Sequence, residues 1–198
     1  MKKSIKKNKV VTYIIIGVIF IVSIILAFLF LLQKSDKDYI QQLDAISQVK
    51  TYENDSLFKE GQKIIEKIKD KQSATKQIIN FYKSWANYTY NLGNVDSSII
   101  IMQKAIEANP HDVVLFTKYG FYLFHSGKED MAVANWKKAI ELDSTFTQSY
   151  VNLITYYFRS KFNIDSLSYY VNMLKKLDPE YPISKVVADT LKHFKKLN

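Results

Sequence analysis

The sequence predicts an all-α protein, in which an N-terminal transmembrane helix is followed by a helical solenoid of about three repeats with flanking helices. Three observations support this fold class. The 198 residues include only 5 Gly and 3 Pro, too few turn residues for a β-sandwich or barrel. The segment Val10–Leu32 contains no charged residue. The tetrapeptide KAIE occurs at Lys104–Glu107 and again at Lys138–Glu141, and recurrence at a period of 34 residues is typical of a solenoid.

Residues 1–9 form a basic tail that is predicted to stay in the cytoplasm. The chain has 28 Lys and Arg against 19 Asp and Glu, and five of the lysines lie in this tail. Without these five lysines, the remainder has 23 basic and 19 acidic residues, so it carries a net charge of only +4. Such a weak excess does not favour nucleic acid as a partner.

Residues 10–32 are predicted to be a transmembrane signal anchor. A helix of 23 residues is about 35 Å long, enough to cross a hydrocarbon core of roughly 30 Å. A cleaved signal peptide is the alternative, but its apolar region is only about 7–15 residues long and ends at a small-x-small site. This run is longer, and no such site follows it.

The flanking charges predict the orientation of this helix. Lysines precede the span, whereas Lys34 and Lys37 after it are matched by Asp36 and Asp38. Because positive flanks stay inside, we expect the N-terminus in the cytoplasm and residues 33–198 on the extracytoplasmic side. A bacterial inner membrane, with the bulk of the chain in the periplasm, is the expected location.

Residues 33–78 are predicted to form juxtamembrane helices or a degenerate repeat. Apolar residues recur at helical spacing in two stretches, one from Ile40 to Val49 and one from Leu57 to Ile68. Glu53-Asn54-Asp55 separates them as a turn and helix N-cap. A degenerate fourth repeat is slightly favoured over a stalk that holds the repeats away from the bilayer.

Residues 79–180 are predicted to contain three repeats with a period of about 34 residues. In the first copy, Tyr82 precedes Trp85-Ala86, and Ser98, Met102 and Pro110 follow. The second copy has Phe116, Tyr119-Gly120, Ala132, Trp136 and Ser144 at the same spacing. The third copy has Tyr150, Leu153-Ile154, Leu167, Val171 and Pro179, with one extra residue near Arg159–Phe162, so we expect looser packing there. This pattern resembles the tetratricopeptide repeat (TPR).

The glycines and prolines mark the ends of the helices. Gly93 and Gly127 lie one period apart, where each first helix is expected to end in a left-handed residue. Pro110 and Pro179 stop the second helices. Residues 181–198 are predicted to form a capping helix, with Ile183, Val186, Val187, Leu191 and Phe194 on its apolar face.

No arrangement of residues predicts catalysis. The chain has no Cys, which excludes a thiol nucleophile and thiolate metal sites, and its His111, His125 and His193 do not form a zinc-binding helix motif. Hydrolase, dinucleotide and calcium-loop motifs are also absent from the sequence. We therefore predict no enzymatic activity, no cofactor, no metal and no catalytic residue.

The resemblance to TPR proteins implies a peptide-binding groove formed by the first helix of each repeat. It places Asn80, Val114 and Gln148 in this groove. The other positions that it implies are Lys83, Asn87, Tyr90, Asn91, Thr117, Phe121, Phe124, His125, Val151, Thr155, Phe158 and Arg159. The alternative is that Phe121 and Phe124 pack beneath the capping helix.

Some TPR proteins hold a C-terminal carboxylate with Lys and Asn, then Asn, then Lys and Arg from three successive repeats. Lys83 and Asn87 match the first pair. Lys118 stands in place of the middle Asn, and Gln148 and Asn152 replace the final Lys and Arg. The resemblance therefore supports a peptide groove more strongly than a carboxylate clamp.

The predicted function is a non-enzymatic, membrane-anchored protein-interaction module, a scaffold or chaperone-like adaptor with a protein or peptide partner. Its plan is similar to inner-membrane TPR proteins that act beside the Sec translocon or in cytochrome c maturation. Two alternatives remain: an accessory subunit of a larger membrane complex, and an import receptor on an organelle surface.

Overall fold

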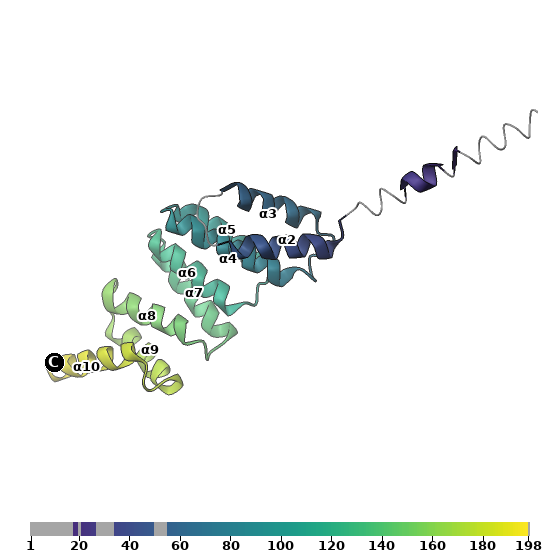
Figure 1. Ribbon diagram of the computed structural model, residues 1–198. Coiled ribbons are helices and arrows are strands. Elements are labelled where there is room, and N and C mark those ends of the chain that lie inside the picture. Colours follow the sequence, from purple (N-terminus) through teal and green to yellow (C-terminus); the bar gives the residue numbers. More distant parts are fainter. Residues whose placement is uncertain (1–17, 20, 27–33, 50–54, 198) are drawn as a thin grey trace, which may run out of the picture.

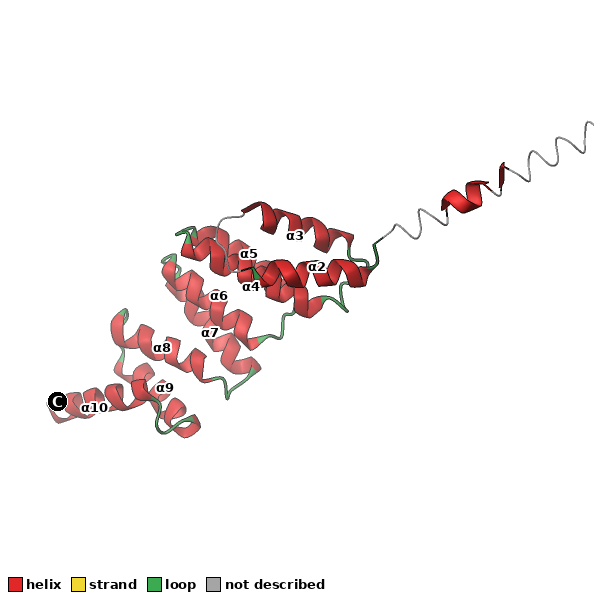
Figure 2. Cartoon of the chain, viewed as in Figure 1, coloured by secondary structure: helices red, strands yellow, loops and turns green. Residues whose placement is uncertain are grey.

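The computed structural model describes residues 18–19, 21–26, 34–49 and 55–197. The described part consists of helices joined by short loops, and contains no strand (Figures 1 and 2). The helices are α2 (Asp36–Gln48), α3 (Asp55–Lys67), α4 (Thr75–Asn91), α5 (Val95–Ala108), α6 (Val113–His125), α7 (Glu129–Leu142), α8 (Thr147–Arg159), α9 (Ile164–Leu177) and α10 (Pro182–Leu197).

Three successive helix pairs form the body of the molecule: α4–α5, α6–α7 and α8–α9 (Figure 1). Each second helix also packs against the first helix of the next pair, so that the pairs stack in chain order. Contacts between α8 and α9 are less extensive than those within the first two pairs, which confirms the looser packing expected for the third repeat. The buried Ile154 and Leu167 at its small-residue positions keep the two backbones apart.

The turns within the pairs confirm the role predicted for the glycines. Gly93 has a φ of 81° and Gly127 a φ of 79°, and both follow the end of a first helix. Behind them, the amide of Asn94 donates to the carbonyl of Thr89 (2.9 Å), and that of Lys128 to the carbonyl of Leu123 (2.9 Å). These bonds, five residues back along the chain, close the ends of the two helices. The third turn has no glycine and is one residue longer.

Small residues allow close approach inside the second pair. Gly120 in α6 is buried against Trp136 in α7, whose indole Nε1 donates to the carbonyl of Thr117 (3.2 Å). A Cβ atom added to Gly120 would lie 2.5 Å from that Nε1. The large–small pairing in the sequence is thus a real steric requirement of the α6–α7 contact.

Helices α2 and α3 close one end of the stack in a different way from the repeats. Here the first helix, α2, makes the broader contact with α4, whereas α3 touches α4 mainly through aromatic side chains. Phe58 of α3 stacks on Trp85 with a ring-centroid distance of 5.7 Å. The assignment of residues 33–78 to a degenerate repeat stays a prediction, because this packing differs from that between the repeats.

Helix α10 closes the other end against α9. Val187 and Leu191 are buried, but Val186 is 62% exposed, so its predicted place on the apolar face is wrong. A narrow buried stripe suffices because α10 packs mainly on one helix. The side chain of Phe194 lies outside the described residues.

Most of the predicted anchor, Val10–Leu32, also lies outside the described residues. Residues 18–19 and 21–26 are helical and exposed. No helix within the described ranges is long and apolar enough to cross a membrane.

Candidate functional site

A cavity of 680 Å³ lies on the face formed by the first helices α4, α6 and α8, and we call it the groove. Its lining comprises Asn87, Tyr90, Asn91, Val114, Thr117, Lys118, Phe121, Tyr122, Phe146, Gln148 and Asn152. These residues come from the last turns of α4, from most of α6 and from the first two turns of α8, together with Phe146 just before α8. The groove therefore crosses the three helices obliquely.

Aromatic rings form the apolar wall of the groove. Phe121 is 38% exposed, and its ring centroid lies 5.4 Å from that of Tyr90. His125 extends this cluster at the edge, with its ring 4.4 Å from Phe121 and 5.5 Å from Tyr90. An exposed aromatic ring already held by neighbouring rings can be buried by a partner at little cost in side-chain entropy.

A buried hydroxyl orients one amide of the groove. The Tyr122 hydroxyl donates to Asn87 Oδ1 at 2.5 Å. Burial raises the pKa of Tyr122 well above its ordinary value, with Tyr90 adding to the shift, so the phenol remains a donor. Because the Asn87 oxygen faces Tyr122, its NH₂ group is the part of the amide that can donate to a ligand.

Lys118 is the half-buried cation of the groove. Burial lowers the pKa of its ammonium, and the positive charge of Lys83 lowers it further. Both effects penalise the charged lysine. A carboxylate placed in the groove would relieve this penalty, since it would pair with the ammonium in a partly desolvated setting.

Thr117 contributes to the scaffold of the groove. Its hydroxyl lies 2.7 Å from that of Ser149, contacts the Val113 carbonyl at 2.9 Å, and is buried. Across the groove, Gln148 Nε2 donates to Asn152 Oδ1 (3.0 Å), which joins two amides on α8. These hydrogen bonds hold the polar side chains of the groove in place in the absence of a ligand.

The structure brings together about half of the residues that the sequence places in the groove. Asn87, Tyr90, Asn91, Thr117 and Phe121 line it, as do Val114 and Gln148.

The remaining predicted positions lie outside the lining. His125 is at the rim, and Lys83 is half-buried close enough to Lys118 to affect its pKa. Phe124 packs against Trp136 and Tyr156, with centroid distances of 5.9 and 6.2 Å. The others that do not line it are Asn80, Val151, Thr155, Phe158 and Arg159.

The reason lies in the oblique course of the groove. The cavity ends on the first two turns of α8, so Thr155, Phe158 and Arg159 fall beyond it on later turns. Val151 and Phe158 pack against the core instead. No residue of α10 lines the groove, so the alternative in which the capping helix covers Phe121 does not hold among the described residues.

Two lining residues, Tyr122 and Phe146, are missed by the sequence analysis, whereas Lys118 and Asn152 enter it only as clamp positions. Tyr122 is buried, and its place one residue after Phe121 gave no groove signal. Phe146 precedes α8 and therefore lies outside helical periodicity. Lys118 and Asn152 occupy the clamp positions of the second and third repeats. This is the sequence signal that could have placed them in the groove.

Comparison with solved structures identifies the fold. The first TPR domain of Spaghetti (RPAP3), bound to an HSP90 peptide, has a TM-score of 0.54 and 18% identity over 61% of this chain and 94% of that one. The second TPR domain of human RPAP3, in complex with an HSP70 peptide, has a TM-score of 0.52 and 16% identity over 60% and 98%. The chain has a TPR-like fold.

A further structure with this fold is YrrB, described as a TPR protein with an unusual peptide-binding site. It has a TM-score of 0.50 and 12% identity over 67% of this chain and 73% of that one. At these sequence identities, the similarity to the TPR structures concerns the fold alone. No protein-family model matches the sequence, and no curated protein matches it.

Proposed function

We propose that this protein is a non-catalytic interaction module that binds a peptide segment of a partner protein in the groove. The observation that carries the proposal is the groove itself, which combines an exposed aromatic wall at Phe121, an oriented amide at Asn87 and a cation at Lys118. Buried aromatic anchors surrounded by a few fixed polar groups are the usual basis of peptide recognition.

Two of the TPR structures named above hold HSP90 and HSP70 peptides, and this supports a peptide as the ligand. Lys118 favours a peptide with an acidic side chain or a free carboxylate near this point. The lysine and arginine of the full carboxylate clamp are replaced by Gln148 and Asn152, which lie on α8 and donate and accept through amides. A broader acidic or polar segment therefore suits the groove.

The groove is tested with the full chain in detergent against a library of peptides that differ in acidity and in C-terminal carboxylate. We expect saturable binding that Phe121→Asp reduces by at least tenfold, because a buried aromatic anchor is worth about 2 kcal/mol or more. Met131→Asp is the matched control, since Met131 is 51% exposed and does not line the groove. Equal loss in both variants, or no loss in either, would refute the groove as the binding site.

The membrane anchor is part of the proposal. Val10–Leu32 spans the bacterial inner membrane, with the basic tail in the cytoplasm and residues 33–198 in the periplasm; this rests on the uncharged run and its lysine flank. Anchoring confines the groove near the membrane and raises its effective concentration toward membrane-bound partners. Resistance to alkaline extraction, together with protease protection of residues 33–198 in intact cells, is the expected result. Release by alkali would contradict it.

A second candidate is an accessory subunit of a larger membrane complex. Leu92 and Ile100 are 62% and 60% exposed and line a separate 450 Å³ hollow beside Trp85. Apolar side chains gathered in this way favour a permanent contact with another protein. A photocrosslinker at Ile100 tests this candidate directly.

A further inference from the structure

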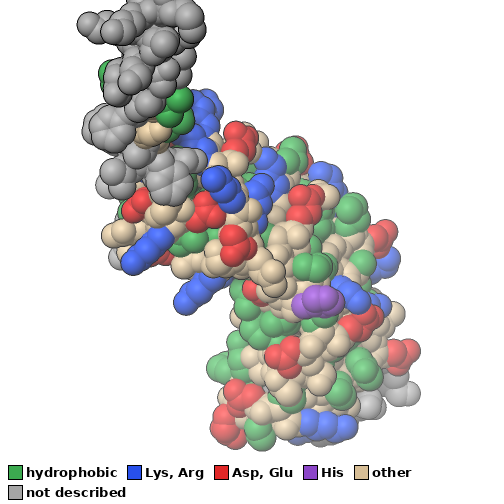
Figure 3. Space-filling model, turned by 90° about the vertical axis from the view of Figure 1, so that its right-hand side faces the viewer, with side chains coloured by type: hydrophobic (Ala, Val, Ile, Leu, Met, Phe, Trp, Pro, Cys, Tyr) green, Lys and Arg blue, Asp and Glu red, His purple; other side chains and the backbone are tan. Residues whose placement is uncertain are grey.

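A cleft lies between α2 and α3, and the groove does not include it. The cleft has a volume of 810 Å³. Figure 3 views the molecule from the end that carries α2 and α3, where basic and acidic side chains are interspersed. The part of this surface that is visible in Figure 3 is therefore mixed in charge.

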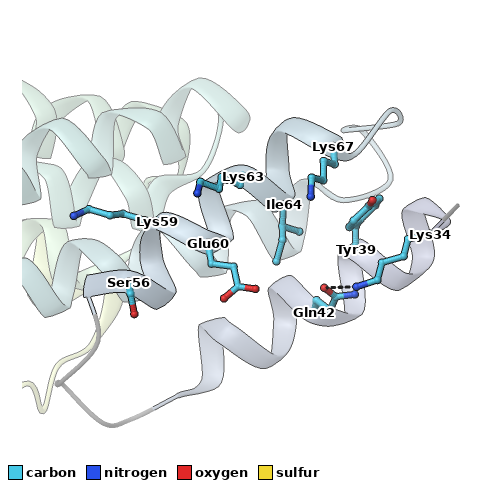
Figure 4. A pocket seen from close by; sticks show the side chains of 9 residues that line it. All are labelled: Lys34, Tyr39, Gln42, Ser56, Lys59, Glu60, Lys63, Ile64 and Lys67. Carbon is cyan, nitrogen blue, oxygen red and sulfur yellow. Dashed lines mark hydrogen bonds between the residues drawn. The ribbon is translucent and has the colours of Figure 1, made fainter. Parts of the chain in front are cut away.

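Four lysines line the cleft and a single acidic residue opposes them. The lysines are Lys34, Lys59, Lys63 and Lys67, and the acidic residue is Glu60. Figure 4 shows Lys34, Gln42, Tyr39 and Lys67 at one end of the cleft, whereas Glu60 and Ser56 lie toward the other. At the Lys34–Lys67 end, the described lining of the cleft thus contains lysines and no carboxylate.

The sequence and the packing of the helices together produce this arrangement. Lys59, Lys63 and Lys67 are four residues apart, which places them on one face of α3. The carboxylate of Asp36, at the start of α2, accepts hydrogen bonds from the amides of Lys69 (3.1 Å) and Asp70 (2.8 Å), just after α3. This tether holds α2 antiparallel to α3 and brings Lys34 to the Lys67 end.

Within the described residues, the charges at this end are only partly compensated: Asp38 lies close enough for Lys34 to lower the pKa of its carboxyl. No described carboxylate forms an ion pair with Lys34, Lys63 or Lys67. Lys34 Nζ donates to Gln42 Oε1 (3.3 Å), and Lys67 Nζ lies 5.8 Å from the centroid of the Tyr39 ring. Like charges held around one cleft repel each other, and an anion bound between them removes that repulsion.

The chemistry of the lining selects the kind of anion. Lysine ammonium groups bind phosphate as point charges, and the phosphate oxygens accept several hydrogen bonds at once. Ile64 is buried at the base of the cleft and supplies an apolar surface beside these donors. Such a lining suits a phosphate group that carries an apolar or uncharged substituent.

We propose that the α2–α3 cleft binds a phosphate-bearing anionic group, and its position favours the headgroup of an anionic lipid as the source. Lys34 lies two residues after Leu32, the last residue of the apolar run. If that run spans the bilayer as proposed above, the cleft lies at the membrane–water interface, where lipid phosphates are concentrated. The lipid source rests on the proposed anchor, whereas the anion site rests on the described lysines alone.

The test uses the full chain in nanodiscs and measures how fast each lysine is acylated, by mass spectrometry. Three arms at equal ionic strength contain phosphatidylcholine alone, phosphatidylcholine with phosphatidylglycerol, and phosphatidylcholine with millimolar inorganic phosphate. We expect phosphatidylglycerol to slow acylation of Lys63 and Lys67 roughly fivefold, the effect of placing each lysine beside an anionic surface group. Lys137, exposed on α7, should keep its rate.

A double variant identifies the cleft as the cause. Lys63→Glu with Lys67→Glu should abolish the protection of Lys34, whereas the matched Lys137→Glu with Lys176→Glu should retain it. Protection by inorganic phosphate in neutral nanodiscs would support the site and assign it to a soluble phosphate compound, even if the anchor fails to insert. Equal slowing at Lys137, or no slowing in any arm, would overturn the proposal.

Discussion

At the scale of single residues, the α6–α7 contact depends on the absence of a side chain at Gly120. The indole of Trp136 occupies the space where a Cβ would stand, and its Nε1 is held by the Thr117 carbonyl. Thr117 in turn lines the groove. A larger side chain at Gly120 is therefore expected to displace groove residues such as Thr117 as well as residues of the core.

We expect Gly120→Leu to lower the free energy of unfolding by about 3 kcal/mol, the upper range for overpacking a core. The measurement is denaturant unfolding of the full chain in detergent, followed by circular dichroism. Ala134→Leu on the exposed face of α7 is the control and should change stability by less than about 0.5 kcal/mol. An unchanged midpoint for Gly120→Leu would show that Trp136 moves aside freely.

Lys118 makes the groove sensitive to pH. Its folded pKa lies below the usual 10.5, so the ammonium loses its proton at a lower pH than a free lysine does. Binding of an acidic peptide should therefore weaken as the pH rises through that lowered pKa, by roughly tenfold for a charge-assisted hydrogen bond. Lys118→Gln should bind more weakly at neutral pH and lose this pH dependence. A wild-type affinity that is constant with pH would argue against contact between Lys118 and the peptide.

At the scale of helices, α3 is held to the stack by an aromatic cluster. Phe58 is buried and contacts Phe81, Trp85 and Tyr88, with centroid distances of 6.0, 5.7 and 5.1 Å. Gly61 permits this approach, because a Cβ there would lie 2.2 Å from the ring of Phe81. The end of the stack that carries the lysine-lined α2–α3 cleft thus depends on one face of α3.

Phe58→Ala should cost about 3 kcal/mol, since it removes a buried ring and leaves a cavity. Hydrogen exchange is expected to rise in α2 and α3, while α6–α9 keep their protection, because the loss is local to one end of a stack of repeats. Ile100→Ala is the control at an exposed site. Uniformly faster exchange along the chain would mean that the stack unfolds as one unit.

Sequence periodicity predicts helices and turns better than it predicts the groove. Gly93 and Gly127 could be assigned because a period of 34 residues repeats both the residue and its backbone conformation. Phe146 could not be assigned to the groove from the sequence, because it precedes α8 and helical spacing therefore does not apply to it. Spacing alone places Val186 on the apolar face, because it does not reveal that α10 packs mainly against one helix.

At the scale of the whole molecule, buried tyrosines make the fold sensitive to alkali. Burial raises the pKa of Tyr82 and Tyr122, and raises that of Tyr170 to about 12. Their folded pKa values exceed the unfolded value near 10, so the stability they contribute is complete below pH 10 and is lost as the pH rises toward 12. Lys118 changes stability with pH in the opposite direction, but it is one group against three tyrosines.

We therefore expect the unfolding midpoint to fall steeply between pH 10 and 12, together with the appearance of tyrosinate absorbance. Tyr170→Phe should reduce this slope, because phenylalanine has no hydroxyl to ionise. A stability that stays level across this range would contradict the burial of these phenols.

The central claim is that a partner protein occupies the groove in the cell, and in-cell photocrosslinking tests it most directly. A photoreactive residue is placed at Phe121 in the groove, at Ile100 in the separate hollow or at Lys137 on the exposed face of α7, and mass spectrometry identifies the adducts. We predict a discrete partner captured at Phe121 and absent at Lys137. Capture only at Ile100, or equally at all three positions, would contradict the claim and make the protein a structural subunit whose groove is not its binding site.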